Sequence, residues 1–188
     1  MLGSREPQKK ELLAWLKAVK DNAKTGTTTE AASFGEIVFL AVAWHAAEDV
    51  LQQIRPQLAG KVVIDVTNPI VFSDDQPPTL SFGHNMSGGE VVQQGLPDSH
   101  VVKTLNFVNF THMADPNYGQ GTPVMFMCGN NDSAKSQTQD ILEELGWNDI
   151  CDIGDISKSR LLEPLCLLWI EYGITRDTWD HAFAVLDQ

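Results

Sequence analysis

The sequence predicts an α/β protein with a doubly wound and mostly parallel sheet. Two near-continuous apolar runs, residues 36–43 and 61–66, are rich in β-branched side chains, as strands buried on both faces of a parallel sheet are. Between them, residues 46–58 place apolar side chains at helical spacing on one face. Two parallel strands need such a crossover, and strands and helices keep alternating downstream, which favours this fold class.

The residues ahead of this central unit predict three short elements. Pro7 suits a first helical turn, and the apolar side chains that follow it recur at helical spacing. Thr27 or Thr28 can cap a second helix that carries Glu30 in its first turn. We therefore expect a helix over 7–20, a short strand over 22–25 and a short helix over 27–34.

The second half of the chain continues the alternation. Two prolines and a glycine in SDDQPPTLSFGH predict a loop, and Asn131 with Asp132 precedes a helix that ends at Gly146. We expect loops over 73–84 and 109–122, helices over 87–95, 132–145 and 157–172, strands over 100–108, 123–128 and within 147–153, and a short segment over 178–186. The chain predicts a single domain over 1–188, with a helical C-terminal segment from about residue 155.

Composition narrows the classes of function. The chain has 13 Lys and Arg against 25 Asp and Glu, a net charge of −12, which argues against nucleic acid and anionic membrane surfaces as partners. The three cysteines are widely spaced and predict no disulfide framework, and the five histidines show no metal-ligand spacing. No apolar run reaches the roughly 18 residues of a membrane span. We expect a cytoplasmic protein that binds no metal.

Candidate binding residues follow three of the predicted strands. Ligands of open parallel sheets bind at the carboxyl ends of the strands. Val42 and Trp44 end the first strand, Asn68 and Pro69 follow the second, and Asn106 follows a third. The alternatives are a half-buried tryptophan at a strand end and a polar Asn-Pro turn.

A second candidate group is Ser4, Arg5 and Lys9, at the junction of a predicted strand and helix. In dinucleotide-binding folds, the end of the second strand meets the adenosine ribose, where an arginine accommodates the extra phosphate of NADP. The alternative is that both cations belong to a solvated helix surface.

Across nearly its whole length, the chain resembles the family of NADP-dependent reductases of the deazaflavin coenzyme. The resemblance rests on MLGSREPQK, on FLAVAWHA with Ala43 where the family has proline, and on VVIDVTNP, VVKTLNFVN, CGNNDSAK and DIGDISKSRLLEPLCLLWI, all in order. It implies a Rossmann-like fold and NADP as cofactor. It further implies that Ser4, Arg5 and Lys9 hold the 2′-phosphate, that Val42, Trp44, Asn68 and Pro69 line the nicotinamide end, and that the second ring lies near the loop after Asn106 and the C-terminal helix.

One departure from the family concerns the first βα unit. The family opens with a strand and a glycine-rich GxGxxG-like turn that holds the pyrophosphate, and this sequence contains no such motif. The missing strand would be the central one, so we expect unpaired strand edges within the sheet and weak cofactor affinity. Tight, micromolar NADPH binding would overturn the second expectation.

The resemblance implies an NADP(H)-dependent oxidoreductase that transfers hydride between NADPH and a flavin-like or deazaflavin acceptor. Such chemistry needs two rings brought face to face, so we name binding residues and no catalytic side chain. The alternatives are a non-catalytic or weakly binding Rossmann-like module and a truncated gene product of such an enzyme. The apolar C-terminal helix also suggests a homodimer, unless it only packs on the sheet.

Overall fold

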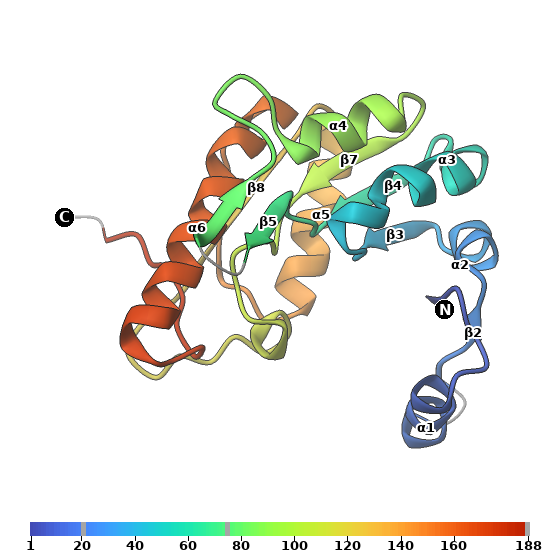
Figure 1. The fold of residues 1–188 in the computed structure, drawn as a ribbon, viewed down its shortest axis with the longest axis horizontal. Coiled ribbons are helices and arrows are strands. Elements are labelled where there is room, and N and C mark those ends of the chain that lie inside the picture. The colour runs from blue at the N-terminus through green and yellow to red at the C-terminus, as the bar shows by residue number, and fades with distance from the viewer. Residues whose placement is uncertain (20–21, 74–75, 187–188) are drawn as a thin grey trace.

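The computed structural model describes residues 1–19, 22–73 and 76–186. A five-stranded sheet in the order β3-β4-β7-β8-β9 forms its centre (Figure 1). Strands β3, β4 and β7 are parallel, β8 is antiparallel to β7, and β9 is parallel to β8. This sheet confirms the predicted α/β class. Its strands are β3 Ile37–Leu40, β4 Val62–Asp65, β7 His100–Lys103, β8 Val124–Gly129 and β9 Asp149–Asp152.

The predicted strand–helix–strand unit is present. Strands β3 and β4 pair in parallel, with Ile37 opposite Val62 at one end and Leu40 opposite Asp65 at the other. The crossover consists of a 3₁₀ turn, η2 (Trp44–Ala46), and helix α3 (Ala47–Leu58). Helix α3 buries its apolar face, as its periodicity predicts. Strand β3 ends at Leu40, before the predicted residue 43, so Trp44 lies four residues beyond the strand.

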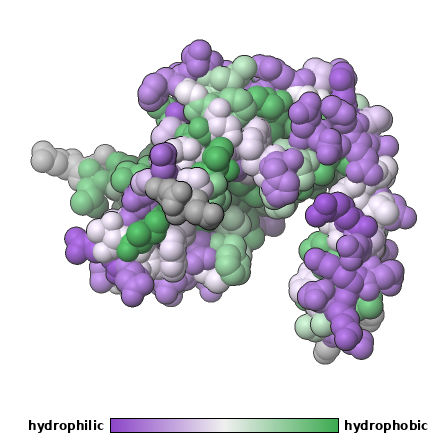
Figure 2. All heavy atoms as spheres, in the orientation of Figure 1, coloured by the Kyte–Doolittle hydropathy of each residue, from purple (hydrophilic) through white to green (hydrophobic). Residues whose placement is uncertain are grey.

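An N-terminal arm precedes this unit. It contains β1 (Leu2–Gly3), α1 (Lys10–Val19), β2 (Thr25–Gly26) and α2 (Thr28–Phe34). Strands β1 and β2 pair in parallel as a separate sheet, and within the described residues no ladder joins them to β3. Figure 2 shows the part of the arm that includes α1 standing apart from the body. The sheet thus has the open edges that the sequence predicts.

The short elements of the arm differ from the prediction at their ends. Helix α1 begins at Lys10 rather than at residue 7, and its predicted last residue, position 20, lies outside the described residues. The strand expected over 22–25 is β2, shifted toward Gly26. Thr27 caps α2, with its hydroxyl accepting from the Glu30 amide and the Glu30 carboxylate accepting from the Thr27 amide.

The predicted loop over 73–84 is wrong in part. Strands β5 (Ile70–Ser73) and β6 (Gln76–Leu80) form an antiparallel hairpin, and positions 74–75 lie outside the described residues. Pro77 and Pro78 lie within β6. An isolated hairpin has only edge strands, and these tolerate proline because one side needs no ladder hydrogen bonds.

The C-terminal half keeps the predicted order of elements. Helices α4 (Gly88–Gly95) and α5 (Asp132–Glu144) match closely, whereas the strand predicted over 100–108 ends at Lys103. Leu105 adopts a φ of 58°, which is incompatible with a continuing strand. A 3₁₀ turn, η3 (Phe110–His112), follows. A further turn, η4 (Ile156–Lys158), leads into α6 (Ser159–Arg176), which is longer than predicted, while residues 178–186 form neither helix nor strand.

Two clusters of buried apolar side chains form the core. One joins β4, β7 and β8 to α5 and α6, and includes Phe107 and Trp147. The other joins β3, β4 and β7 to α3 and α4. The sheet is therefore covered on both faces, as a doubly wound fold requires. Within the described ranges, no helix combines the length and apolarity needed to cross a membrane.

Candidate functional site

The carboxyl ends of β3, β4 and β7 bring together the residues that the sequence places after each strand. The Asn68 Nδ2 donates to the Asn106 backbone oxygen at 2.7 Å, and the Asn106 Nδ2 donates to the Asn68 Oδ1 at 2.9 Å and to the Leu162 carbonyl at 3.0 Å. Within the described part of the chain, the buried Asn106 Oδ1 has no hydrogen-bond partner. This edge of the sheet thus presents an unused acceptor.

Trp44 lies beside this pair, against the start of α4. A Cβ added at Gly88 would lie 3.2 Å from the Trp44 ring, 3.2 Å from the Pro69 Cδ and 3.0 Å from the Glu163 Oε1. The Phe82 ring meets Trp44 edge-on, with centroids 5.8 Å apart. Trp44 and Val42 are half-buried, and Pro69 is buried. Glycine at position 88 therefore permits the close approach of α4 to the indole and the proline.

Directly beneath these residues lies a buried ionic cluster. The Lys103 Nζ is 3.0 Å from the Asp65 Oδ2 and 3.3 Å from the Glu163 Oε1, and all three side chains are 0–1% exposed. It also donates to the Thr67 carbonyl. The amides of Gly88 and Gly89, at the start of α4, each donate to Glu163 at 2.9 Å. The cluster ties β4, β7, α4 and α6 together.

The burial of this cluster shifts the pKa values of its members. Burial alone would lower the pKa of Lys103, but the Asp65 and Glu163 carboxylates outweigh it and raise that pKa above its ordinary value. Burial raises the pKa of Glu163, and Lys103 and the two amides offset only part of that rise. The ammonium is therefore the fixed charge around which both carboxylates are arranged.

Ser4, Arg5 and Lys9 lie on the N-terminal arm, where β1 turns into α1. The Ser4 amide extends the ladder to Gly26, and the Ser4 hydroxyl accepts from the Glu6 amide at 3.1 Å. Arg5 and Lys9 are exposed. Their position at the end of β1 is the one predicted, but within the described residues no hydrogen bond or ion pair joins these three side chains to Trp44, Asn68 or Asn106.

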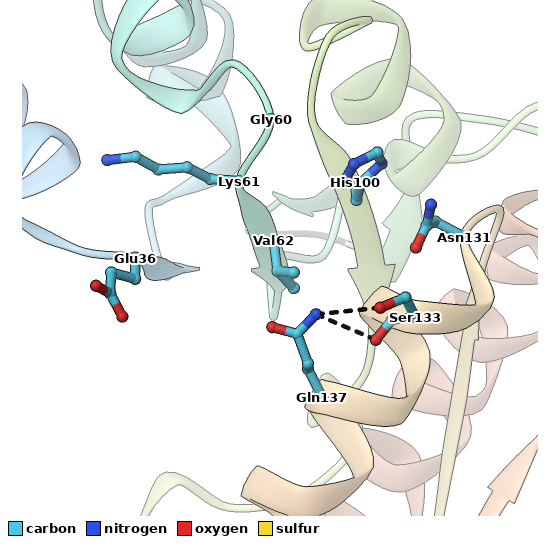
Figure 3. Close-up of a pocket in the computed structure, with 8 residues that line it drawn as sticks. All are labelled: Glu36, Gly60, Lys61, Val62, His100, Asn131, Ser133 and Gln137. Carbon is cyan, nitrogen blue, oxygen red and sulfur yellow. Dashed lines mark hydrogen bonds between the residues drawn. The ribbon is translucent and has the colours of Figure 1, made fainter.

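A hollow of about 410 Å³ opens at the opposite edge of the sheet (Figure 3). The starts of β4, β7 and α5 line it. The Lys61 side chain turns away from the hollow, and its Nζ donates to three carbonyls at the end of α2 and just beyond, Ala32, Ser33 and Gly35. These bonds satisfy the end of that helix. Because ligands of parallel sheets bind at the carboxyl ends of strands, this hollow is not the candidate site.

Sequence reasoning missed the ionic cluster. Asp65 and Lys103 are charged residues inside otherwise apolar strands, and the parallel register places them opposite each other. That combination was a usable signal, since a charge in a doubly buried strand needs a partner. Glu163, within the apolar helix α6, is the third such charge.

Comparisons with known proteins identify the family to which this chain is similar. Residues 1–69 match the family described as NADP oxidoreductase coenzyme F420-dependent. The F420-dependent NADP reductase of Methanocaldococcus jannaschii is 27% identical over 146 residues, which cover 77% of this chain and 65% of that protein. Metalloreductase STEAP3 of Rattus norvegicus is 28% identical over 171 residues, which cover 89% of this chain and 32% of that protein.

A solved structure is similar over nearly the whole chain. The crystal structure of a candidate F420-dependent NADP reductase from Arthrobacter sp. FB24 is 30% identical, with a TM-score of 0.91, over 98% of this chain and 87% of that chain. Fold and relatives together place the chain in a class of Rossmann-like proteins, the NADP-dependent oxidoreductases. Within that class, the protein belongs to the family of coenzyme F420-dependent NADP oxidoreductases. The chain spans less than two thirds of the Methanocaldococcus jannaschii reductase and about a third of the Rattus norvegicus metalloreductase.

Proposed function

We propose that this protein takes part in hydride transfer between NADPH and a flavin-like or deazaflavin acceptor. The observation that carries the proposal is the convergence of Trp44, Asn68 and Asn106 at three adjacent strand ends, in a chain that belongs to a family of NADP oxidoreductases. NADPH would supply a hydride, and the acceptor would take it up with a proton from solvent.

The strand-end residues fit the nicotinamide end of the cofactor. The unpartnered Asn106 Oδ1 is an acceptor suited to the amide hydrogens of a carboxamide. Asn68 fixes the rotamer of Asn106 through its reciprocal hydrogen bonds. Trp44, held against Pro69 and Gly88, would form one wall for the ring and exclude water from it.

The N-terminal arm fits the other end of the cofactor. The Arg5 guanidinium and the Lys9 ammonium are exposed, and both follow β1, where charge-assisted hydrogen bonds to a 2′-phosphate would form. The sequence supplies no glycine-rich turn for the pyrophosphate. The residues of this chain therefore supply candidate contacts for both ends of NADP.

A second candidate function is that of a non-catalytic or weakly binding module. Within the described residues no ladder joins β1 and β2 to β3, and this separation favours it. The two functions differ in one measurable property. A module would bind NADPH without passing its hydride to any acceptor.

The experiment is steady-state oxidation of NADPH with a panel of deazaflavin, flavin and quinone acceptors. Trp44→Ala should lower kcat/KM at least tenfold, because the nicotinamide ring would lose the indole that packs against it. Trp15→Ala is the matched control, since Trp15 lies on α1 and is 38% exposed, and it should leave kcat/KM unchanged. No turnover with any acceptor, or equal losses in both variants, would refute the proposed hydride transfer at this site.

A further inference from the structure

The N-terminal arm carries a charge of the opposite sign to the rest of the chain. Residues 1–26 contain 6 of the 13 Lys and Arg but 3 of the 25 Asp and Glu, a net charge of +3. The other residues contain 7 Lys and Arg against 22 Asp and Glu, a net charge of −15. Figure 2 shows the part of the arm that includes α1 standing apart from the body, and salt screens exposed charges beyond about 8 Å. The arm is therefore a basic surface on an acidic protein.

Helix α1 gathers two of these cations in one row. Lys10, Leu13 and Lys17 are three and four residues apart, so their side chains lie along the same side of the helix. All three are exposed. Lys10 begins α1, where the helix macrodipole is positive and disfavours a cation. In the described ranges, no side chain of α1 makes a hydrogen bond or an ion pair. We call this row the basic face.

The last turns of α5 carry the opposite charge. Glu143 and Glu144 are three and four residues beyond Asp140, so like charges are neighbours on an exposed helix surface. They also lie at the negative end of the macrodipole, in a last turn without a basic residue. Among the described residues, none of these three carboxylates has an ion pair, and the lysine of α5 already pairs with two other carboxylates. Both arrangements destabilise α5, and a cation from another surface would offset them. We call these three residues the acidic end of α5.

A second copy of the chain is the partner that these charges favour. Each copy carries both a basic face and an acidic end, so two copies related by a two-fold axis can form two equal contacts. In the described structure, no side-chain hydrogen bond or ion pair joins α1 to α5 of the same chain. An anionic membrane surface would attract the basic face but repel the net charge of −15 on the remaining residues. The charge distribution therefore favours a protein surface.

We propose that the basic face of α1 docks on the acidic end of α5 in a second copy of this chain, and that the exchange is reciprocal. Lys10 and Lys17 would pair with the carboxylates, and Leu13, which is 38% exposed, would be covered between them. A contact between exposed charges is weak and sensitive to salt. It uses neither the strand-end residues nor the apolar C-terminal helix α6, so it does not depend on the proposed hydride transfer.

The test is the average mass of the full chain in sedimentation equilibrium at low and at high salt. We expect the mass to rise at low salt, and Lys17→Glu to weaken that association at least tenfold, because it places a carboxylate against carboxylates. Glu144→Lys should weaken it equally. The two substitutions in one chain should restore it, because the charges are exchanged. Arg55→Glu is the matched control, since it reverses an exposed cation on α3, and it should associate as the unchanged protein does.

Several results would overturn the proposal. One is an average mass that does not depend on salt, and another is an equal effect of Lys17→Glu and Arg55→Glu. A charge-exchanged chain that stays dissociated would also contradict it. A salt-dependent change in sedimentation rate at constant mass would mean that α1 folds back on its own chain instead. Binding of a monomeric protein to phosphatidylserine vesicles, abolished by Lys17→Glu, would assign the basic face to a membrane surface.

Discussion

Replacing Lys103 with methionine tests the structural role of the buried ionic cluster. The substitution keeps the length of the side chain but removes an ammonium that lies 3.0 Å from Asp65 and 3.3 Å from Glu163. The Asp65 Oδ1 would keep its hydrogen bonds from the Thr67 amide and hydroxyl, and Glu163 those from Gly88 and Gly89. The Asp65 Oδ2 would lose its charged donor, and two buried carboxylates would lose their shared counter-charge.

The expected loss is about 3–5 kcal/mol of unfolding free energy, the usual cost of leaving a buried charge uncompensated. Urea denaturation followed by circular dichroism measures it, with an expected fall in the midpoint of roughly 2 M. The loss should shrink as the pH falls from about 7 to about 5. Burial already raises the pKa of Glu163, and without the ammonium that offsets part of this rise, the folded-state pKa of Glu163 would rise further. Such groups contribute stability below their unfolded pKa and lose it as the pH rises through the folded pKa.

A matched control is Lys135→Met, which removes an ammonium from a partly exposed pair with Asp132 and Asp152. We expect about 1 kcal/mol or less there, because water screens the remaining carboxylates. If Lys103→Met costs no more than this control, or if its loss does not depend on pH, the cluster is not the ionic junction described above. If Lys103→Met does not fold, Glu163→Gln, which keeps shape and one acceptor, gives a smaller loss of about 1–3 kcal/mol that still tests the reasoning.

Three further predictions concern packing and assembly. Gly89→Ala should lower the stability of the folded protein by about 1–3 kcal/mol in thermal unfolding, because the added Cβ would lie 2.3 Å from the Ser159 Oγ. Gly83→Ala is the control and should be neutral, because its Cβ would meet only a side-chain oxygen at 3.8 Å. Lys61→Met should cost about 1–2 kcal/mol in urea by uncapping α2, and an unchanged midpoint would argue against that cap. The predicted homodimer would use the α6 row Leu161, Leu165, Leu168 and Tyr172, of which Leu161 and Leu168 are 62% and 56% exposed. Leu168→Glu should then convert dimer to monomer in light scattering and Phe110→Glu should not, and a monomeric unchanged protein would refute the dimer.

Local signals in the sequence predicted much of the fold. Apolar runs and helical spacing located the β3–α3–β4 unit, and the capping threonine and asparagine located the starts of α2 and α5. The rule that ligands meet the carboxyl ends of parallel strands located Asn68 and Asn106, which the structure joins by reciprocal hydrogen bonds. These features depend on residues close in sequence or on a general property of parallel sheets.

Features that depend on distant contacts were not predicted. The sequence predicts a loop where the β5–β6 hairpin forms, because two prolines normally exclude a strand. The hairpin tolerates them because it is isolated from the main sheet. The ionic cluster joins Asp65, Lys103 and Glu163 across as many as 98 positions, counted from the residue numbers 65 and 163. Strand β7 ends early because Leu105 adopts a left-handed backbone conformation. The sequence gives no sign of it, because left-handed positions are usually occupied by glycine and this one is a leucine.

The most direct test of the central claim is the affinity of this chain for NADPH and for NADH, measured by fluorescence titration with Arg5→Glu and Lys17→Glu as matched charge reversals. If Arg5 binds the 2′-phosphate, NADPH binds weakly but about tenfold or more tightly than NADH, Arg5→Glu abolishes that preference, and Lys17→Glu, on the far turn of α1, preserves it. Equal affinity for the two dinucleotides, or equal losses for both in Arg5→Glu, would contradict the account.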